Sequence, residues 1–277
     1  MIPKDSKAIS PFEIQANEFE LFKSFIYEQA GILLAEHKKH LVANRLARRL
    51  RHFNFSRYKD YYELVQNNAG EQRIAIDLLT TNETYFFREP KHFDFLKDNI
   101  LKQWPSNKKL RCWSAAASTG EESYSLAMLI DSQLGITPWE VFASDINHSV
   151  LKKAKAAHYL TDRIDGIPEN FLKKYCLKGT GEYQGSLLIS PKIRHRVSSA
   201  PINLTHPLPQ NGKFDVIFLR NVMIYFDNET KEKIINKMTN QLSDGGYLFI
   251  GHTESLKAIE HKLVEVTPTI FRRKESQ

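Results

Sequence analysis

The feature that most constrains this chain is the stretch from Leu110 to Leu134, which has the pattern of a buried strand, a small-residue turn and a helix. Leu110, Cys112 and Trp113 form a short apolar run with the length of a buried strand. Residues 115–120 are all small, which lets a ligand approach the backbone, and apolar residues at helical spacing follow them. In α/β folds, a turn of this kind after the first strand of a parallel sheet binds nucleotide-like ligands.

The composition of this turn limits the class of ligand that it could bind. Gly120 is its single glycine, so it lacks the three spaced glycines of the dinucleotide fingerprint, and no Gly-Lys-Ser/Thr of a phosphate loop follows. Glu121 and Glu122 suit the positive end of the helix dipole but would repel a pyrophosphate. S-adenosylmethionine, with its hydroxyls, amine and sulfonium, suits such a turn. An ordinary βα turn with incidental small residues is the alternative.

The next expected strand supports the nucleotide interpretation. Residues 139–146, WEVFASDI, are strand-like and end at Asp145. An acidic residue roughly 20 residues past a glycine turn commonly accepts hydrogen bonds from ribose hydroxyls. Asp145 could instead cap the helix expected from Asn147 or Ser149. Its position at the carboxyl end of a strand, one βα unit after the turn, favours the ribose role.

Four longer motifs make the chain resemble the CheR family, the chemotaxis-receptor methyltransferases that use S-adenosylmethionine to esterify receptor glutamates. The motifs are TNETYFFRE at 81–89, SAAASTGEE at 114–122, FASDIN at 142–147 and FDVIFLRNVMIYFD at 214–227. They follow the order of the family, and the resemblance runs from about Phe19 to Phe271, nearly the whole chain.

The resemblance implies a set of site residues. Those implied to bind the cofactor are Asn82, Thr84, Arg88, Ala116, Gly120, Glu121, Glu122, Asp145, Asn203, Leu204, Arg220 and Asn221. Arg88 and Tyr225 are implied to be catalytic, since a guanidinium could hold a substrate carboxylate in a fixed orientation and the tyrosine resembles one near the transferred methyl. A core aromatic with a surface hydroxyl is the alternative role for Tyr225.

The expected fold class is α/β: a small N-terminal all-α domain, then a doubly wound, Rossmann-like S-adenosylmethionine methyltransferase domain with a small antiparallel β insertion. The expected divisions are an N-terminal arm at 1–16, the all-α domain at 17–80, a linker and connecting helix at 81–109, and the methyltransferase domain at 110–277. The insertion is expected at about 177–199, with strands at 186–189 and 192–197, and a last strand at about 264–272. Asn17 is expected to cap the first helix with Glu20 as its partner.

The partner surface is expected to be acidic. Lys38, Arg45, Arg48 and Arg49 line one face of the helix expected at 36–53, and the whole chain carries a net charge of +7. The family implies that this domain faces the acidic methylation helices of the receptor, although a solvated face is the simpler alternative. Nucleic acid would use the same chemistry but is not expected, because no aromatic stacking motif accompanies the patch. The turn GTGEYQG at 179–185 resembles family members that grip the receptor's C-terminal tail peptide by strand addition.

The reaction implied by the resemblance is a single displacement that gives a glutamate methyl ester and S-adenosylhomocysteine. Glutamate is ionised at neutral pH, so neither a general base nor a metal is expected. Two isolated cysteines and the lack of a signal or membrane-spanning run predict a cytoplasmic protein that is not inserted in the membrane, and nothing demands more than a monomer. A methyltransferase for RNA or another protein, and a non-catalytic cofactor-binding regulator, are the alternatives. A nicotinamide dehydrogenase is disfavoured by the missing glycine fingerprint.

Overall fold

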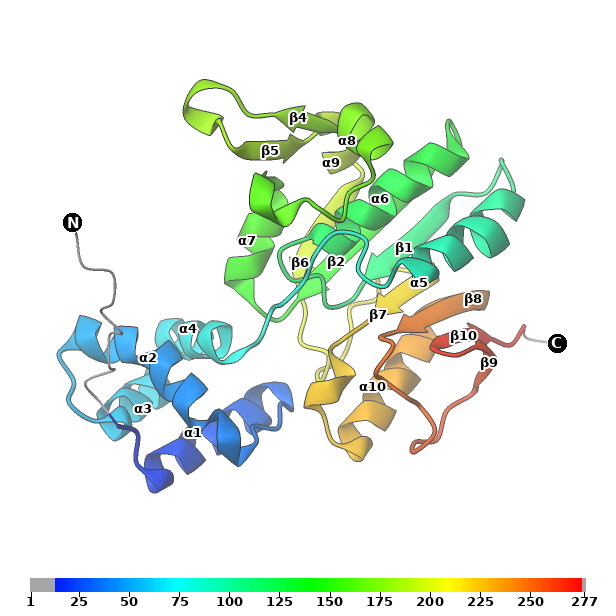
Figure 1. The fold of residues 1–277 in the computed structure, drawn as a ribbon. Coiled ribbons are helices and arrows are strands. Elements are labelled where there is room, and N and C mark those ends of the chain that lie inside the picture. Colours follow the sequence, from blue (N-terminus) through cyan, green and yellow to red (C-terminus); the bar gives the residue numbers. More distant parts are fainter. Residues whose placement is uncertain (1–12, 276–277) are drawn as a thin grey trace. The chain divides into compact units, whose positions relative to one another are not determined.

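The computed structural model describes residues 13–275, and the chain divides into two compact units, residues 1–81 and 82–277 (Figure 1). Most of the N-terminal arm expected at 1–16 therefore lies outside the described residues. Residues 82–109, which the sequence presents as a connection, are part of the second unit. Within the described residues, no helix is both long enough and apolar enough to cross a membrane.

The first unit is all-helical within its described residues. Its helices are α1 (Ala16–Ala30), the 3₁₀ turn η1 (Glu36–Lys38), α2 (Lys39–Phe53), α3 (Tyr58–Asn67) and α4 (Ala69–Leu79). Apolar and aromatic side chains at helical spacing form its core: Phe19, Phe22 and Ile26 of α1 are buried, and Phe22 stacks on Tyr61 of α3. The predicted all-α domain is confirmed.

The first helix begins earlier than predicted. Gln15, not Asn17, is the N-cap residue of α1, and its capping-box partner is Glu18, whose carboxylate accepts a hydrogen bond from the Gln15 amide at 2.9 Å. Glu18 also accepts one from the amide of Lys59 at 3.0 Å, so it ties the start of α1 to the start of α3. This tertiary contact selects the capping register, which the local sequence alone does not reveal.

The second unit is built on a seven-stranded sheet with the strand order β6-β2-β1-β7-β8-β10-β9. The strands are β1 (Leu110–Ser114), β2 (Trp139–Asp145), β6 (Val197–Pro201), β7 (Phe214–Leu219), β8 (Leu242–Ile250), β9 (Leu263–Thr267) and β10 (Ile270–Arg273). The first five pair in parallel, and β10 and β9 add antiparallel strands at one edge. Helices α6 (Glu121–Leu134), α7 (His148–Ala156) and α10 (Asn228–Gln241) provide crossovers. The doubly wound sheet predicted from the sequence is confirmed.

The apolar runs of the sequence occupy the centre of this sheet. Every residue of β7 is buried, as expected for a central parallel strand covered on both faces. Phe218 of β7 stacks on Phe249 of β8 with ring centroids 4.4 Å apart, and Trp113 of β1 is also buried. The connection before β1 is helical: α5 (Pro90–Phe95), the π-helical turn η2 (Leu96–Ile100) and the 3₁₀ turn η3 (Leu101–Gln103).

Two local predictions are wrong. The strand expected at 192–197 is instead the short helix α9 (Pro191–Arg194), because Pro191 occupies the first helical position, where proline is favoured; β6 of the main sheet follows. The last strand expected at 264–272 is a hairpin, β9 and β10, which turns at Thr269, a residue with a φ of 69°.

The antiparallel insertion is present as a separate three-stranded sheet, but its strands span 158–189 and not the predicted range of about 177–199. Its order is β3-β5-β4, with the central strand antiparallel to both neighbours. The elements of this region are β3 (His158–Leu160), η4 (Thr161–Arg163), α8 (Glu169–Tyr175), β4 (Cys176–Lys178), η5 (Gly181–Tyr183) and β5 (Ser186–Ile189).

Candidate active site

The predicted cofactor residues lie where the parallel strands end. The turn at 115–120 follows β1, Asp145 ends β2, Asn203 follows β6, and Asn221 follows β7. Because these strands are parallel and adjacent, their carboxyl ends meet at one edge of the sheet. The Asp145 carboxylate joins two of these ends: it accepts hydrogen bonds from the amides of Ser118 at 2.8 Å and Asn147 at 2.9 Å. Asn147, not Asp145, caps α7.

Gly120 sets the shape of the turn after β1. Its φ of 97° lies in the region that favours glycine, and a Cβ placed on it would lie 2.9 Å from both the Ala154 Cβ and the Tyr159 hydroxyl oxygen. The Tyr159 hydroxyl donates to the Thr119 carbonyl at 2.8 Å. Helix α7 and strand β3 therefore hold the turn closely. Ala116 and Thr119 are its half-buried residues, and the other residues of 115–120 are buried.

The segment 82–89 is bound to this edge of the sheet. Asn82 accepts hydrogen bonds from the Ser118 hydroxyl at its carbonyl, at 2.8 Å, and from the Asn147 amide group at its side-chain oxygen, at 2.9 Å. The Thr84 carbonyl accepts from Arg163, which also pairs with the buried Glu121 at 3.0 Å.

Phe86 is the anchor of that segment. Its ring is buried and meets Tyr159 edge-on with centroids 5.0 Å apart. Its carbonyl oxygen lies so near Gly166 that a Cβ there would be 2.0 Å away, so only glycine fits that position. Phe87 is half-buried, and its amide donates to the Ser125 hydroxyl of α6 at 2.9 Å, whereas Tyr85 is exposed.

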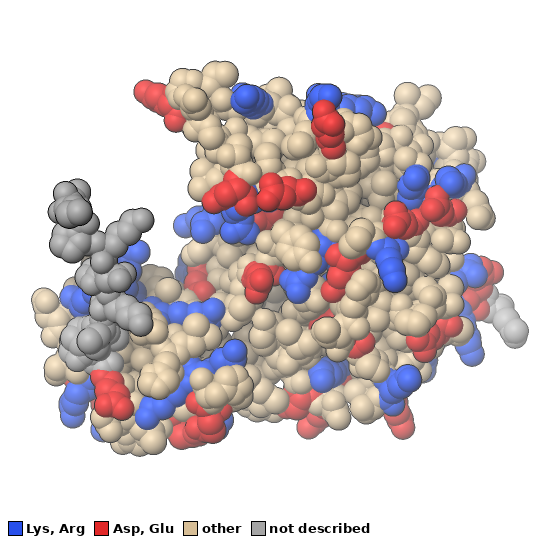
Figure 2. Space-filling view, in the orientation of Figure 1, with Lys and Arg blue, Asp and Glu red and all other residues tan. Residues whose placement is uncertain are grey.

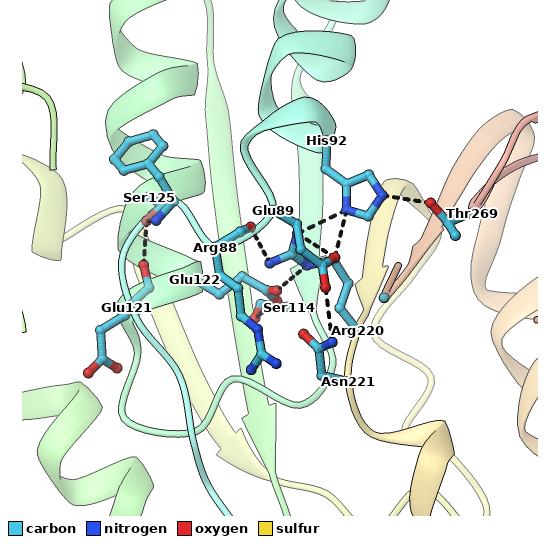
Figure 3. Close-up of polar contacts among 12 residues, drawn as sticks. Arg88, Glu89, His92, Ser114, Glu121, Glu122, Ser125, Arg220, Asn221 and Thr269 are labelled. Atoms are coloured by element: carbon cyan, nitrogen blue, oxygen red, sulfur yellow. Dashed lines mark hydrogen bonds and ion pairs between the residues drawn. The ribbon is translucent and has the colours of Figure 1, made fainter. Parts of the chain in front are cut away.

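Arg88 lies between two residues with left-handed backbones. Phe87 has a φ of 53° and Glu89 a φ of 59°, and such conformations cost about 1–3 kcal/mol each for non-glycine residues. Arg88 is half-buried; its guanidinium donates to the Glu83 carbonyl at 2.9 Å and lies over the Tyr85 ring. In Figure 3 it points away from the cluster around Arg220. The strained turn thus directs the Arg88 side chain away from the protein's internal ion pairs.

Arg220 and Glu122 form an internal network instead of presenting free charges (Figure 3). The Arg220 side chain is 1% exposed, and its Nε donates to the Glu122 carboxylate at 2.8 Å. Its Nη2 donates to the Arg88 carbonyl at 2.7 Å, and its Nη1 contacts His92 Nδ1 at 2.9 Å. Glu122 also accepts from the Ser114 hydroxyl at 2.7 Å. These two residues hold the turn that carries Arg88, while a direct contact with the cofactor remains a prediction.

His92 belongs to the same network and stays neutral in it. Burial, with a further contribution from the Arg220 charge, lowers the pKa of His92 to about 3. Its Nε2 lies 2.8 Å from the Thr269 hydroxyl. With Glu89 and His252 it forms a group whose ligand atoms lie within 4.8 Å of one another, but the adjacent guanidinium occupies Nδ1 and would repel a cation. The arrangement is that of a hydrogen-bonded network.

The buried, neutral His92 predicts a pH dependence of stability. Between pH 6.5 and about 3, the unfolded chain binds a proton at this residue that the folded chain excludes. The free energy of unfolding should therefore fall as pH falls through this window, by up to about 1.4 kcal/mol per pH unit. Urea unfolding at about pH 7 and about pH 5.5 measures this slope. His92→Asn, which keeps an acceptor for Arg220 but cannot be protonated, should show a shallower slope; equal slopes would contradict the assignment.

The loop after β7 is held by a residue that the sequence did not single out. Glu254 is buried, and its carboxylate accepts hydrogen bonds from the amides of Asn221 at 2.9 Å, Met223 at 2.7 Å, Ile224 at 3.3 Å and Gly251 at 2.6 Å. The turn η6 (Met223–Tyr225) ends at Tyr225, which is half-buried. Glu254 therefore fixes the backbone that carries both Asn221 and Tyr225. No local pattern links it to a loop about 30 residues away.

Asn203 and Leu204 begin the loop after β6. The Asn203 side-chain oxygen accepts from the amide of Thr205 at 3.0 Å and from its hydroxyl at 2.7 Å. Leu204 is buried, and its carbonyl accepts from Lys237 of α10. The Asn221 amide group donates to Glu89 at 3.1 Å. Both asparagines are half-buried at the edge where Asp145 ends its strand, so the predicted set converges on one edge of the sheet.

The four basic residues predicted to face a receptor divide into two pairs. Lys38 and Arg48 are exposed. Arg45 donates to the carbonyls of Leu79 at 3.0 Å and Thr80 at 3.1 Å, which close the end of α4. Arg49 forms a two-pronged pair with Glu71. Blue basic side chains are visible over the helical unit in Figure 2, and of the four predicted residues Lys38 and Arg48 are exposed whereas Arg45 and Arg49 are half-buried.

A doubly wound sheet, a small-residue turn after β1 and an acidic residue that ends β2 define a nucleotide-binding α/β protein. The acceptor-rich edge, with Asp145, Asn82 and Asn203, suits a cofactor whose ribose and amine are donors. Residues 82–271 match the family described as CheR methyltransferase, SAM binding domain, and residues 17–80 match the CheR methyltransferase all-alpha domain. The chain belongs to the CheR methyltransferase family, and the predicted family is confirmed.

Named relatives match nearly the whole chain. A chemotaxis protein methyltransferase of Escherichia coli K12 is 40% identical over 260 residues, covering 91% of this chain and 89% of that protein. Chemotaxis protein methyltransferase 2 of Pseudomonas aeruginosa is 37% identical, covering 94% of each. A solved glycopeptide N-methyltransferase, MtfA, in complex with S-adenosylmethionine has a TM-score of 0.36 at 15% identity, over 62% of this chain and 58% of that one, too distant to add to the assignment.

Proposed function

We propose that this protein transfers the methyl group of S-adenosylmethionine to glutamate carboxylates of chemotaxis receptors, giving glutamate methyl esters and S-adenosylhomocysteine. The observation that carries the proposal is the match of both units to one methyltransferase family, with relatives of nearly equal length named chemotaxis protein methyltransferases. The free thiols of Cys112 and Cys176 fit action in the cytoplasm.

The mechanism requires alignment of the substrate carboxylate with the methyl group more than chemical activation of the carboxylate. The bound cofactor supplies an electrophilic methyl group on a sulfonium. A glutamate carboxylate is already ionised at neutral pH, so the protein need not remove a proton. In our proposal, Arg88 holds the substrate carboxylate and Tyr225 borders the methyl, while Asp145, Asn203 and Asn221 hold the cofactor. Two sets of hydrogen bonds support this proposal: the Arg88 carbonyl accepts from Arg220, and the Glu254 carboxylate accepts from the amides of the 221–224 loop. They hold the backbone that carries Arg88 and Tyr225 before substrate arrives.

The test is transfer of labelled methyl from S-adenosylmethionine to membranes that contain chemotaxis receptors, followed by alkali. We expect label on the receptor and its release as methanol in base, because carboxyl esters hydrolyse there. Base-stable label would indicate methylation on nitrogen and a different substrate. Receptor whose methylation-region glutamates are replaced by alanine is the matched control. Saturable binding of S-adenosylhomocysteine without any transfer would instead support the regulator alternative.

The exposed pair on the helical unit should affect receptor recognition. The variant Lys38→Gln/Arg48→Gln is expected to raise the KM for receptor about three- to tenfold, because exposed charges contribute about 0.2–1 kcal/mol each. The Kd for S-adenosylhomocysteine should not change. Arg57→Gln/Lys59→Gln removes the same net charge from the start of α3, where Arg57 is the N-cap residue, and serves as control. Equal KM increases in both variants would show that the net charge of the unit attracts the receptor, and would contradict a specific role of Lys38 and Arg48.

We further propose that the three-stranded sheet binds the C-terminal tail peptide of a receptor by strand addition. In the order β3-β5-β4, the outer strands β3 and β4 are edges, and an edge can pair with an added strand. Leu177 of β4 is 50% exposed beside Lys178, which suits a peptide with an apolar and an acidic residue. The turn 179–185 between β4 and β5 carries the likeness to tail-binding members of the family.

A further inference from the structure

A cavity in the α/β unit has no part in the proposed reaction. It has a volume of about 390 Å³ where α6, α7 and α9 approach strands β2 and β6, and it opens to solvent, since Lys155 and His195 at its wall are exposed. These three helices all contact β6, the edge strand of the seven-stranded sheet, and Figure 1 shows them around this edge. The volume is within the range of small-molecule sites. Of the residues predicted to bind the cofactor, Gly120 alone lines it.

The wall of this cavity is basic and carries no carboxylate. Lys155 of α7, Arg194 of α9 and His195 line it, and no Asp or Glu is among its lining residues. Lys192, also on α9, pairs with Asp131, whereas no ion pair joins Lys155 or Arg194 to a carboxylate in the described part of the chain, residues 13–275. The positive charge around the cavity is therefore not balanced by a neighbouring acidic side chain.

Two buried polar atoms at this cavity have no hydrogen-bond partner among the described residues. One is the hydroxyl oxygen of Ser123, a residue that is 1% exposed, and the other is Nε of Arg194. Buried polar groups in native proteins are nearly always paired, so these two, from different elements, indicate a missing ligand atom or water. Ser198 and Ser199 of β6 also line the cavity, and because successive strand residues point to opposite faces, one of the two hydroxyls can serve as a further donor.

We propose that this cavity binds a small phosphorylated molecule. A phosphate group accepts several hydrogen bonds at once and suits a guanidinium, an ammonium and hydroxyls that converge from separate elements. The cavity is larger than one phosphate, and the ring of Tyr124 with Ala143 and Val197 gives an apolar wall for an attached organic group. The shared ligand chemistry is the phosphate monoester.

The test uses calorimetric titration with inorganic phosphate and with phenyl phosphate at constant ionic strength, once without S-adenosylhomocysteine and once with saturating S-adenosylhomocysteine, which fills the donor site. We expect saturable binding of both probes, tighter for phenyl phosphate. Arg194→Gln should weaken binding at least about tenfold, since a charged hydrogen bond is lost. Ser123→Ala should weaken it about threefold without lowering stability, because the hydroxyl it removes has no partner. Lys152→Gln, exposed on α7 and outside the cavity lining, is the control and should bind as the parent does.

Three results would overturn the proposal. They are the absence of saturable binding by both probes, equal weakening in Lys152→Gln and Arg194→Gln, and binding that S-adenosylhomocysteine abolishes. Binding that S-adenosylhomocysteine abolishes would mean that the phosphate binds in the donor site. The absence of binding by both probes would mean that the cavity holds only water. None of these readouts depends on methyl transfer, so the proposal can fail while the proposed function stands.

Discussion

Arg220→Met is expected to lower the free energy of unfolding by about 3–5 kcal/mol, the usual cost of removing one partner of a buried ion pair. The Arg220 side chain is 1% exposed and that of Glu122 is 10% exposed, so the carboxylate would remain in the interior without its cation. The Arg88 carbonyl and His92 Nδ1 would lose their donor as well. The apolar side chain of methionine fills much of the same space. A large loss in the free energy of unfolding would therefore be caused by removal of the positive charge and not by a cavity.

Urea unfolding at constant pH measures this effect. Arg57→Met is the matched control, because the Arg57 side chain is 67% exposed where it pairs with Asp60, and exposed pairs contribute about 0–1 kcal/mol. Arg220→Met/Glu122→Gln should recover part of the stability, since the stranded charge is removed. A loss below about 1 kcal/mol in Arg220→Met would show that the network is not a structural support.

Arg88→Ala is expected to lower kcat/KM for receptor methylation by about 100-fold or more, with a Kd for S-adenosylhomocysteine within about threefold of the parent. The guanidinium is directed away from the internal network by a turn that the protein holds at both Phe87 and Glu89. Its backbone contacts do not need its side chain, so the fold should tolerate alanine. The lost function is then orientation of the substrate carboxylate.

Initial rates with receptor membranes and calorimetry with S-adenosylhomocysteine separate the two roles predicted for Arg88. Lys91→Ala, exposed in the first turn of α5, removes a nearby charge without touching the site and should retain the parent's rate. Arg88→Lys should recover only part of the rate, because an ammonium lacks the two-pronged geometry. Parallel losses of rate and cofactor affinity would assign Arg88 to cofactor binding alone.

The sequence predicts the frame of the site well. The strand at 110–114, the glycine that opens α6 and the aspartate that ends β2 all follow from local patterns, because strand length, small residues and polarity are properties of short segments. The family resemblance extends the same information to the loops after β6 and β7. Local patterns also predict the all-α character of the first unit.

The sequence does not predict which charges are internal. Glu122 and Arg220 are 98 positions apart, and each alone has the pattern of a ligand-binding residue at a turn; only the parallel pairing of β1 with β7 brings them together. Arg45 and Arg49 similarly contact the end of α4 and Glu71. The contacts of Glu254 and the helix at 191–194 depend on tertiary packing in the same way. Whether the predicted residues contact cofactor or receptor stays a prediction.

The binding of segment 82–89 to the strand ends has a consequence for how this protein can change over evolutionary time. The division between the units falls at residues 81 and 82, so every residue predicted to hold the methyl donor or align the reaction is on one side, and every basic residue predicted to recognise the receptor on the other. The catalytic part is modular. A lineage could replace the unit predicted to face the receptor without rebuilding the predicted catalytic site, while the sheet proposed to bind the receptor tail would stay with the catalytic unit.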